Sequence, residues 1–134
     1  MMLLNDFFKI AGVAGTAVTV EFNPEHVIYK AHFPGHPITP GVCIIQVITE
    51  VLEQELGTPL ELALVKNLKF ISTISPVDDS TVTINLSQVD NSTAGQVKAK
   101  GTITAGSKLY TKFSLVYNVQ DEAETSLDGK SLQK

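Results

Sequence analysis

The stretch KAHFPGHPITPGVCIIQVITE, Lys30–Glu50, decides the fold that we predict for this chain. Three prolines and two glycines fall between positions 34 and 41. Proline fixes φ and disfavours helix in the residue before it, whereas glycine permits positive φ, so this half is expected to be a rigid loop. The apolar run that follows predicts a helix over Val42–Leu56 that ends at Gly57. His32 and His36 therefore lie in a loop that leads into a helix N-terminus, where the first amides lack intrahelical acceptors.

The predicted helix is apolar around most of its circumference, so other elements must wrap it and not merely cover one side. Alternation of apolar and polar residues before and after the helix predicts strands that supply this wrapping. The expected strands are Phe7–Val13, Thr16–Phe22, Leu62–Thr73, Thr81–Val89, Gln96–Thr104 and Leu109–Asn118, whereas Glu25–Tyr29 carries no clear pattern. Because the connections are short, antiparallel pairing is favoured. The sequence thus predicts an α+β fold, a curved antiparallel sheet wrapped around one long central helix.

A chain of 134 residues is expected to form one domain, here residues 1–119. Residues 120–134 are polar with almost no core-forming side chains, which predicts a disordered tail. The net charge of −4 and the lack of arginine and tryptophan argue against nucleic acid as a partner. No stretch reaches the length of a membrane span, and the N-terminus lacks the order of a secretory signal. With one cysteine, Cys43, expected to be buried and unpaired, these features predict a cytoplasmic protein.

The run HFPGHPITPGV resembles the active-site loop of the FabZ-type β-hydroxyacyl-acyl-carrier-protein dehydratases, whose pattern is roughly HFPGxPxxPGV followed by a helix. The later run NLKFISTISPVDDSTVTI is similar to the strand, turn and strand that follow the helix in that family. The resemblance covers roughly residues 5–118 and implies the hotdog fold, in agreement with the sheet and helix predicted above. One position departs from the family. An acidic residue there follows the histidine by fourteen positions, whereas this chain has Gln46.

The resemblance implies dehydration of a 3-hydroxyacyl thioester, which requires removal of an α-proton and loss of the 3-hydroxyl. His32 is expected to be the base, because an imidazole titrates near the working pH. The backbone amides of Gly41 and Val42 are expected to stabilise the negative charge that develops on the thioester oxygen. Four further residues that match the motif are expected to shape the loop: Phe33, Pro34, Gly35 and Pro40.

Gln46 cannot replace the missing acid as a proton donor, because an amide does not titrate in the useful range. It is expected either to orient the 3-hydroxyl or a water, or to begin a solvated polar stripe along the helix. Glu50 lies one turn further on, about 6 Å along the axis, and is expected to be solvated, with the alternative role of the acid. His26 and His36 receive surface or structural roles. No metal and no cofactor is predicted, because His32 and His36 lie in a proline-broken loop and not on one helical face.

Three functions stay open on the sequence. The first is a dehydratase-like enzyme of fatty-acid-type biosynthesis, acting on acyl chains carried by acyl carrier protein or coenzyme A. The second is a thioesterase of the same fold, in which Glu50 or Gln46 would act at the scissile carbonyl. The third is a non-catalytic acyl-binding subunit, or one half of a heterodimer whose partner supplies the acid. The replacement of the acid by Gln46 favours this third function.

Exposed edges of a curved sheet predict a homodimer or an assembly of dimers. An acidic carrier protein would require a basic docking surface. Lys30, Lys66 and Lys69 are the candidates for that surface, with ordinary solvated lysines as the alternative. An apolar tunnel between helix and sheet would take the acyl chain, whose length the sequence does not define.

Overall fold

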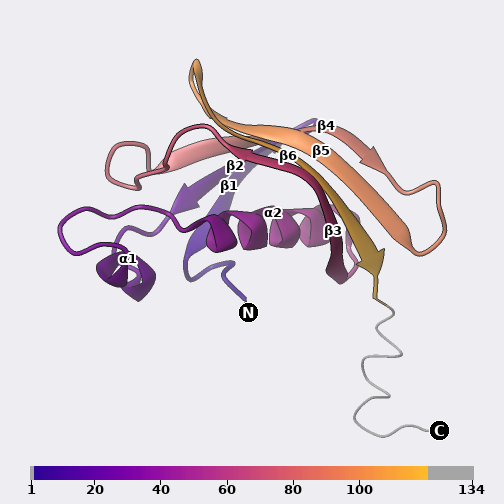
Figure 1. Cartoon of the computed structure of the whole chain (residues 1–134), viewed down its shortest axis with the longest axis horizontal. Helices are drawn as coiled ribbons and strands as arrows, with labels where there is room; N and C mark the ends of the chain where they lie inside the picture. Colours follow the sequence, from indigo (N-terminus) through magenta and orange to yellow (C-terminus); the bar gives the residue numbers. More distant parts are fainter. Residues whose placement is uncertain (1, 121–134) are drawn as a thin grey trace, which may run out of the picture.

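The structure is a computed structural model that describes residues 2–120. Its elements are β1 (Phe8–Ala14), β2 (Ala17–Phe22), α1 (Val27–Ala31), α2 (Gly41–Leu56), β3 (Leu60–Phe70), β4 (Thr81–Asp90), β5 (Gln96–Ala105) and β6 (Lys108–Val119). The predicted order of two strands, one long helix and four strands is confirmed, and the short helix α1 occupies the segment that gave no clear pattern (Figure 1). The predicted disordered tail lies outside the described residues, apart from Gln120, whose amide donates to the carbonyl of Pro59 at 3.0 Å.

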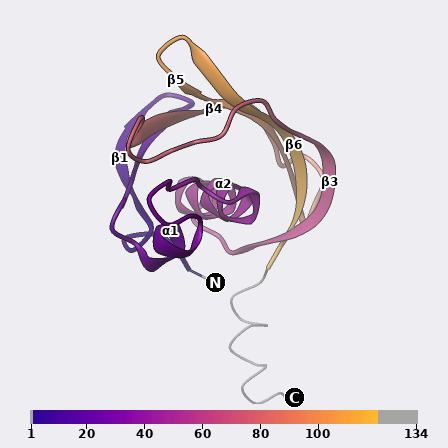
Figure 2. The same cartoon turned by 60° about the vertical axis from the view of Figure 1, so that its left-hand side comes forward.

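The six strands form one antiparallel sheet in the order β1-β2-β4-β5-β6-β3. β3 follows α2 in the chain but pairs with β6, so it forms one end of the sheet while β1 forms the other. The register shifts between neighbouring strands in four of the five pairings. Such bulges bend a strand and increase its twist, so the sheet curls instead of lying flat. Figure 2 shows the result, a sheet that curves around α2. The predicted architecture is confirmed.

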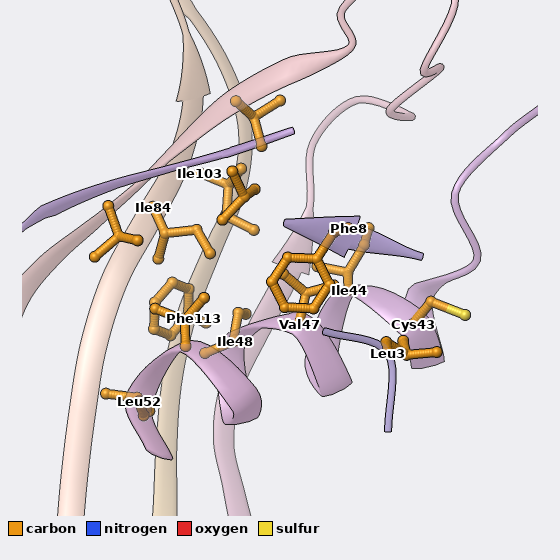
Figure 3. Packing of buried hydrophobic residues seen from close by; sticks show 14 of the residues in the cluster. Leu3, Phe8, Cys43, Ile44, Val47, Ile48, Leu52, Ile84, Ile103 and Phe113 are labelled. Atoms are coloured by element: carbon orange, nitrogen blue, oxygen red, sulfur yellow. The ribbon is translucent and has the colours of Figure 1, made fainter. Parts of the chain in front are cut away.

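The core lies between α2 and the concave face of the sheet. Ile48, Val51 and Leu52 of the helix are fully buried, and burying a side chain of this size contributes roughly 1.5–3 kcal/mol to folding. Helix and sheet side chains interlock in Figure 3, in which Leu3 and Phe8 of the N-terminal region also pack against the helix. The helix is therefore enclosed by more than the sheet, as its all-round apolarity predicts.

Helix α2 has 16 residues and ends where the sequence predicts. Gly57 has φ 67°, a left-handed conformation that glycine adopts without steric cost, and its amide donates to the carbonyl of Glu53. The Glu53 carboxylate accepts the amide hydrogen of Leu60 at 2.8 Å, which starts β3 directly after the turn. Within residues 2–120, neither α2 nor α1 has the length and apolarity needed to cross a membrane.

Strand β3 differs in its limits from the predicted strand Leu62–Thr73. It starts at Leu60 and ends at Phe70. The amides of Ile71 and Ser72 both donate to the carbonyl of Tyr110, at 2.8 and 3.2 Å, so the chain leaves the regular ladder there. Phe70 and the three residues after the strand, Ile71, Ser72 and Thr73, line a cavity that is described below.

Candidate active site

The proline-rich loop is closed by its own backbone hydrogen bonds. In the turn Phe33–His36 the two end residues donate to each other's carbonyl oxygens, at 3.1 and 2.8 Å. Pro34 followed by Gly35 at φ 75° is the pattern of a type II turn. The amide of Ile38 donates to the carbonyl of His32 at 2.8 Å and closes the loop at its base. Three of the loop-shaping residues proposed from the motif, Phe33, Pro34 and Gly35, thus form the turn that directly follows His32.

His32 lies at the C-terminal end of α1, where its amide donates to the carbonyl of Ile28 at 3.0 Å. Its side chain is exposed, and its ring meets the ring of Phe33 edge to face with centroids 5.6 Å apart. The imidazole also lines a cavity of about 460 Å³, called here the His32 cavity. The other lining residues are largely apolar: Phe33, Ile38, Thr39, Pro40, Gly41, Ile44, Phe70, Ile71, Ser72 and Thr73. The exposed imidazole of His32 thus adjoins a largely apolar cavity.

The start of α2 forms one wall of this cavity. The carbonyl of Pro40 accepts the amides of Cys43 and Ile44, at 3.0 and 3.1 Å, so the amides of Gly41 and Val42 precede the first intrahelical bond. A Cβ on Gly41 would lie 2.9 Å from ring carbons of Phe70, so a larger residue there requires the Phe70 ring to move. Gly41, a proposed donor to the thioester oxygen, therefore lines the same cavity as His32.

Glu50 is buried, with 2% of its surface exposed, so the expectation of a solvated residue is wrong. Its Oε1 accepts the amides of Leu3 and Leu4 at 2.9 and 2.7 Å. Its Oε2 accepts the amide of Leu3 at 2.8 Å and the Nε2 hydrogen of Gln46 at 2.8 Å. The carboxylate thus ties the N-terminal segment to α2. Both carboxylate oxygens are thus engaged by donors from the N-terminal backbone and from Gln46.

Gln46 is half-buried and lines a different cavity, also of about 460 Å³, called here the Gln46 cavity. Its other lining residues come from α2, the N-terminus and the start of β3: Met2, Ile45, Thr49, Glu53, Leu60 and Leu62. Gln46 therefore lines a cavity together with Thr49 and Glu53, which belong to the same polar stripe of α2. His32 does not line this cavity, and Gln46 does not line the His32 cavity. The two residues of one chain therefore line separate cavities.

Cys43, next to the proposed oxyanion donors, has the role of a buried apolar residue. It is 4% exposed and free, as predicted. Burial raises the pKa of the Cys43 thiol, whereas a nucleophilic cysteine requires a lowered pKa. His26 has a structural role, because its Nδ1 caps α1 by accepting the amide of Ile28 and its Nε2 lies 3.1 Å from Asp6. His36 is exposed and lies outside the lining of the His32 cavity.

The segment 70–73 is a cavity wall that the sequence analysis did not identify. Tyr110 holds both this segment and the chain that follows it, because its carbonyl accepts the amides of Ile71 and Ser72 and its hydroxyl donates to the carboxylate of Asp79. Burial, followed by the Asp79 carboxylate, raises the pKa of Tyr110 to about 12, which keeps the hydroxyl protonated as the donor. No local pattern could reveal this wall, because it depends on pairing between segments about forty residues apart in sequence.

Known proteins share this fold or resemble this chain in sequence. The 3-hydroxyacyl-acyl-carrier-protein dehydratase FabZ of Fusobacterium nucleatum is 30% identical over 98 residues, which span 69% of this chain and 67% of that protein. The dehydratase heterocomplex ApeI:P from Xenorhabdus doucetiae contains a chain with a TM-score of 0.54 at 15% identity, covering 78% of this chain and 89% of its own. A hypothetical thioesterase solved with coenzyme A from Streptococcus pneumoniae has a TM-score of 0.59 at 12% identity. The match covers 84% of this chain and 85% of that chain.

A curved antiparallel sheet around one central helix defines the hotdog fold, which the solved neighbours share. Residues 13–108 match the model of the ApeI-like family, described as ApeI dehydratase. The chain belongs to this ApeI-like family of hotdog dehydratases, and FabZ proteins are among its relatives.

Proposed function

We propose that this protein removes water from 3-hydroxyacyl thioesters carried by acyl carrier protein or coenzyme A. The observation that carries the proposal is the exposed imidazole of His32 in an apolar cavity whose wall includes the first residue of α2. The thioester oxygen would accept hydrogen bonds from the amides of Gly41 and Val42, while His32 removes the α-proton and then delivers it to the departing 3-hydroxyl, which leaves as water. The acyl chain would extend along the apolar wall beside Ile44 and Phe70.

The site is proposed to be completed by a second protein chain. Strand β3 ends the sheet with one edge not paired to any strand in the described part of the chain, and it exposes Leu64 and Val65. Such an edge is a template for pairing with a second β3. The Gln46 cavity lies between α2 and the start of this strand, so pairing there brings a partner's loop toward it. We propose that His32 of one copy and Gln46 of the other share a substrate, with Gln46 holding the 3-hydroxyl.

A carrier protein would dock beside the His32 cavity. Lys69 precedes the cavity residue Phe70 and stands directly opposite Lys112 on β6, and both lysines are exposed. Like charges placed opposite each other destabilise a sheet, so an acidic partner would relieve this repulsion. Lys30 and Lys66 are also exposed, as a docking surface requires.

A thioesterase is the second candidate, favoured by the fold neighbour described as a hypothetical thioesterase. Glu50 is engaged by the backbone of residues 3 and 4. Glu53, whose carboxylate accepts the Leu60 amide, lines the Gln46 cavity and is proposed as the carboxylate of this candidate.

A heterodimer is the third candidate, favoured by the glutamine at position 46 and by the neighbour that is part of a dehydratase heterocomplex. In a homodimer each of the two sites receives Gln46, whereas a different hotdog partner can bring a carboxylic acid.

The purified protein should convert a 3-hydroxyacyl thioester to the enoyl thioester, measured as ultraviolet absorbance of the conjugated product. Thiol release is followed in the same reaction with a thiol-reactive dye, since hydrolysis frees a thiol and dehydration does not. Carrier-protein and coenzyme A substrates are compared at low and high salt, because docking through lysines weakens as salt screens it. Thiol release without enoyl product would favour the thioesterase. Neither product would favour the heterodimer subunit.

The Gln46→Glu variant is expected to have a proton donor at position 46 and a free energy of unfolding that depends on pH. The introduced carboxyl would lie about one hydrogen bond from the Glu50 carboxylate, which Gln46 Nε2 now contacts at 2.8 Å. Two close carboxylates cannot both ionise easily, so the pKa of the introduced carboxyl is raised. A raised pKa keeps it protonated around neutral pH, the state that a donor to the 3-hydroxyl needs, and dehydration is expected to rise by about 10²-fold. This gain should be lost as pH rises through the raised pKa.

The stability of Gln46→Glu follows the same sign. A carboxyl with a raised folded-state pKa stabilises the fold below its unfolded pKa, and that contribution is lost as pH rises through the folded value. Urea unfolding between pH 5 and pH 9 should therefore show a loss of stability with pH, at about 1.4 kcal/mol per unit of pKa shift. Gln46→Met, which adds no charge, is the control. Equal pH dependence in the two variants would contradict the prediction.

A further inference from the structure

His32 directly follows helix α1, whose position must be fixed by contacts with the rest of the protein. Helix α1 has five residues, and helices this short are not stable in isolation. Tyr29 is its one buried residue, at 2% exposure. The direction in which His32 projects therefore depends on how Tyr29 is anchored.

Tyr29 is anchored at its ring and at its hydroxyl. The ring stacks on that of Phe7, with centroids 4.9 Å apart and planes at 21°. The hydroxyl lies 2.8 Å from Oγ1 of Thr39, which is itself 4% exposed. Burial raises the pKa of Tyr29, so its hydroxyl stays protonated and able to donate. The phenol thus forms a buried side-chain bond between α1 and the far end of the loop.

Thr39 is fixed to the other half of the site. It directly precedes Pro40, whose carbonyl accepts the first intrahelical bonds of α2, and its own amide donates to the carbonyl of Ile74 at 2.8 Å. Thr39 also lines the His32 cavity. The bond from Tyr29 to Thr39 therefore joins the element that carries His32 to the element that carries the amides of Gly41 and Val42.

We propose that Tyr29 and Thr39 are positioning residues that set the geometry between the His32 imidazole and the amides at the start of α2. This inference rests on the proposed function. The backbone bond from Ile38 to the carbonyl of His32 fixes the main chain of the loop but not the tilt of α1. The hydroxyl pair fixes that tilt, and a displacement of about 1 Å at a reacting group can lower a rate by about 10²-fold.

The test compares variants that differ by one hydroxyl. Tyr29→Phe and Thr39→Val are expected to lower kcat for dehydration by about 10–100-fold with KM nearly unchanged, whereas Thr39→Ser, which keeps the hydroxyl, should retain most of the rate. Tyr117→Phe is the matched control. It removes the hydroxyl of another buried tyrosine, bonded to Thr49 Oγ1 at 2.9 Å on a different part of α2. Both tyrosine variants should lose about 1 kcal/mol of stability, but only Tyr29→Phe should lose kcat.

A second readout does not depend on activity. The His32 ring signal, assigned in the NMR spectrum by its absence in His32→Ala, should shift or broaden in Tyr29→Phe and Thr39→Val but not in Tyr117→Phe or Thr39→Ser. If the wild type turns over no 3-hydroxyacyl thioester, the proposed function fails and this signal alone decides the positioning role. A His32 signal that is unchanged in Tyr29→Phe would overturn the inference, whatever the activity.

Discussion

Replacing His32 by alanine is expected to lower kcat for dehydration by about 10²–10⁴-fold, the usual cost of losing a general base. The fold should persist, because the imidazole is exposed and the loop is held by backbone bonds that alanine retains. Steady-state rates of enoyl thioester formation and urea unfolding curves measure the two effects separately.

His36→Ala is the matched control for this experiment. His36 lies in the same loop and is also exposed, but its contacts with Phe33 are made by the main chain. Its replacement should leave kcat within about twofold, since surface substitutions rarely disturb a fold. Equal losses in the two variants would assign the effect to the loop and not to the imidazole.

Mixing variants tests whether a site uses two copies of the chain. His32→Ala and Gln46→Met are each expected to be impaired as homodimers. After unfolding and refolding together, random pairing would give about half mixed dimers, each with one intact site, and hence about a quarter of the wild-type rate. Recovery is expected if His32 and Gln46 come from different copies. No recovery would place both residues of a working site on one chain.

Glu50→Ala is expected to lower the free energy of unfolding by about 3–5 kcal/mol, because it removes a buried charge-assisted acceptor and leaves its donors without a partner. The carboxylate accepts the amides of Leu3 and Leu4 and the side-chain amide of Gln46. Leu3, at 3% exposure, packs into the core and would be released with the N-terminal segment. A domain of this size has only about 5–15 kcal/mol of stability in total, so the expected loss is a large fraction of it.

Urea unfolding measures this loss, and hydrogen exchange locates it. The amides of Leu3 and Leu4 should lose protection in Glu50→Ala, while amides of the central strands keep theirs relative to the global stability. Glu55→Ala is the control, since Glu55 is exposed on the same helix and should change stability by less than about 0.5 kcal/mol. A stability loss as small as that of the control would contradict the anchoring role of Glu50.

The Glu50 anchor also bears on why Gln46 is an amide. An amide at position 46 donates to the buried carboxylate, whereas an acid there brings a second negative charge beside it. The departure from the FabZ pattern and the fixed N-terminal segment thus belong to one hydrogen-bonded group. If the protein forms a heterodimer, Gln46 of this chain supports the Glu50 anchor, and the acid that supplies the proton comes from the partner.

Turns, helix ends and strands that depend on neighbouring residues could be predicted from the sequence. Pro34 and Gly35 restrict φ locally and predict the turn, and Gly57 supplies the left-handed residue that stops α2. The alternation along Thr81–Val89 predicts a half-buried strand with no knowledge of its partners, and β4 spans Thr81–Asp90. The motif also places His32 next to the start of α2, because loop and helix are consecutive in the chain.

The partner of each polar side chain could not be predicted from the sequence, because it depends on how distant segments pack. A carboxylate on the stripe of α2 has the same sequence pattern whether it faces water or the amides of Leu3 and Leu4, which are 47 and 46 residues away. The same holds for Phe70, whose ring covers Gly41, and for the hydroxyls of Tyr29 and Thr39. Local periodicity reports which side chains are apolar, but burial of a polar group depends on contacts formed when distant segments pack together.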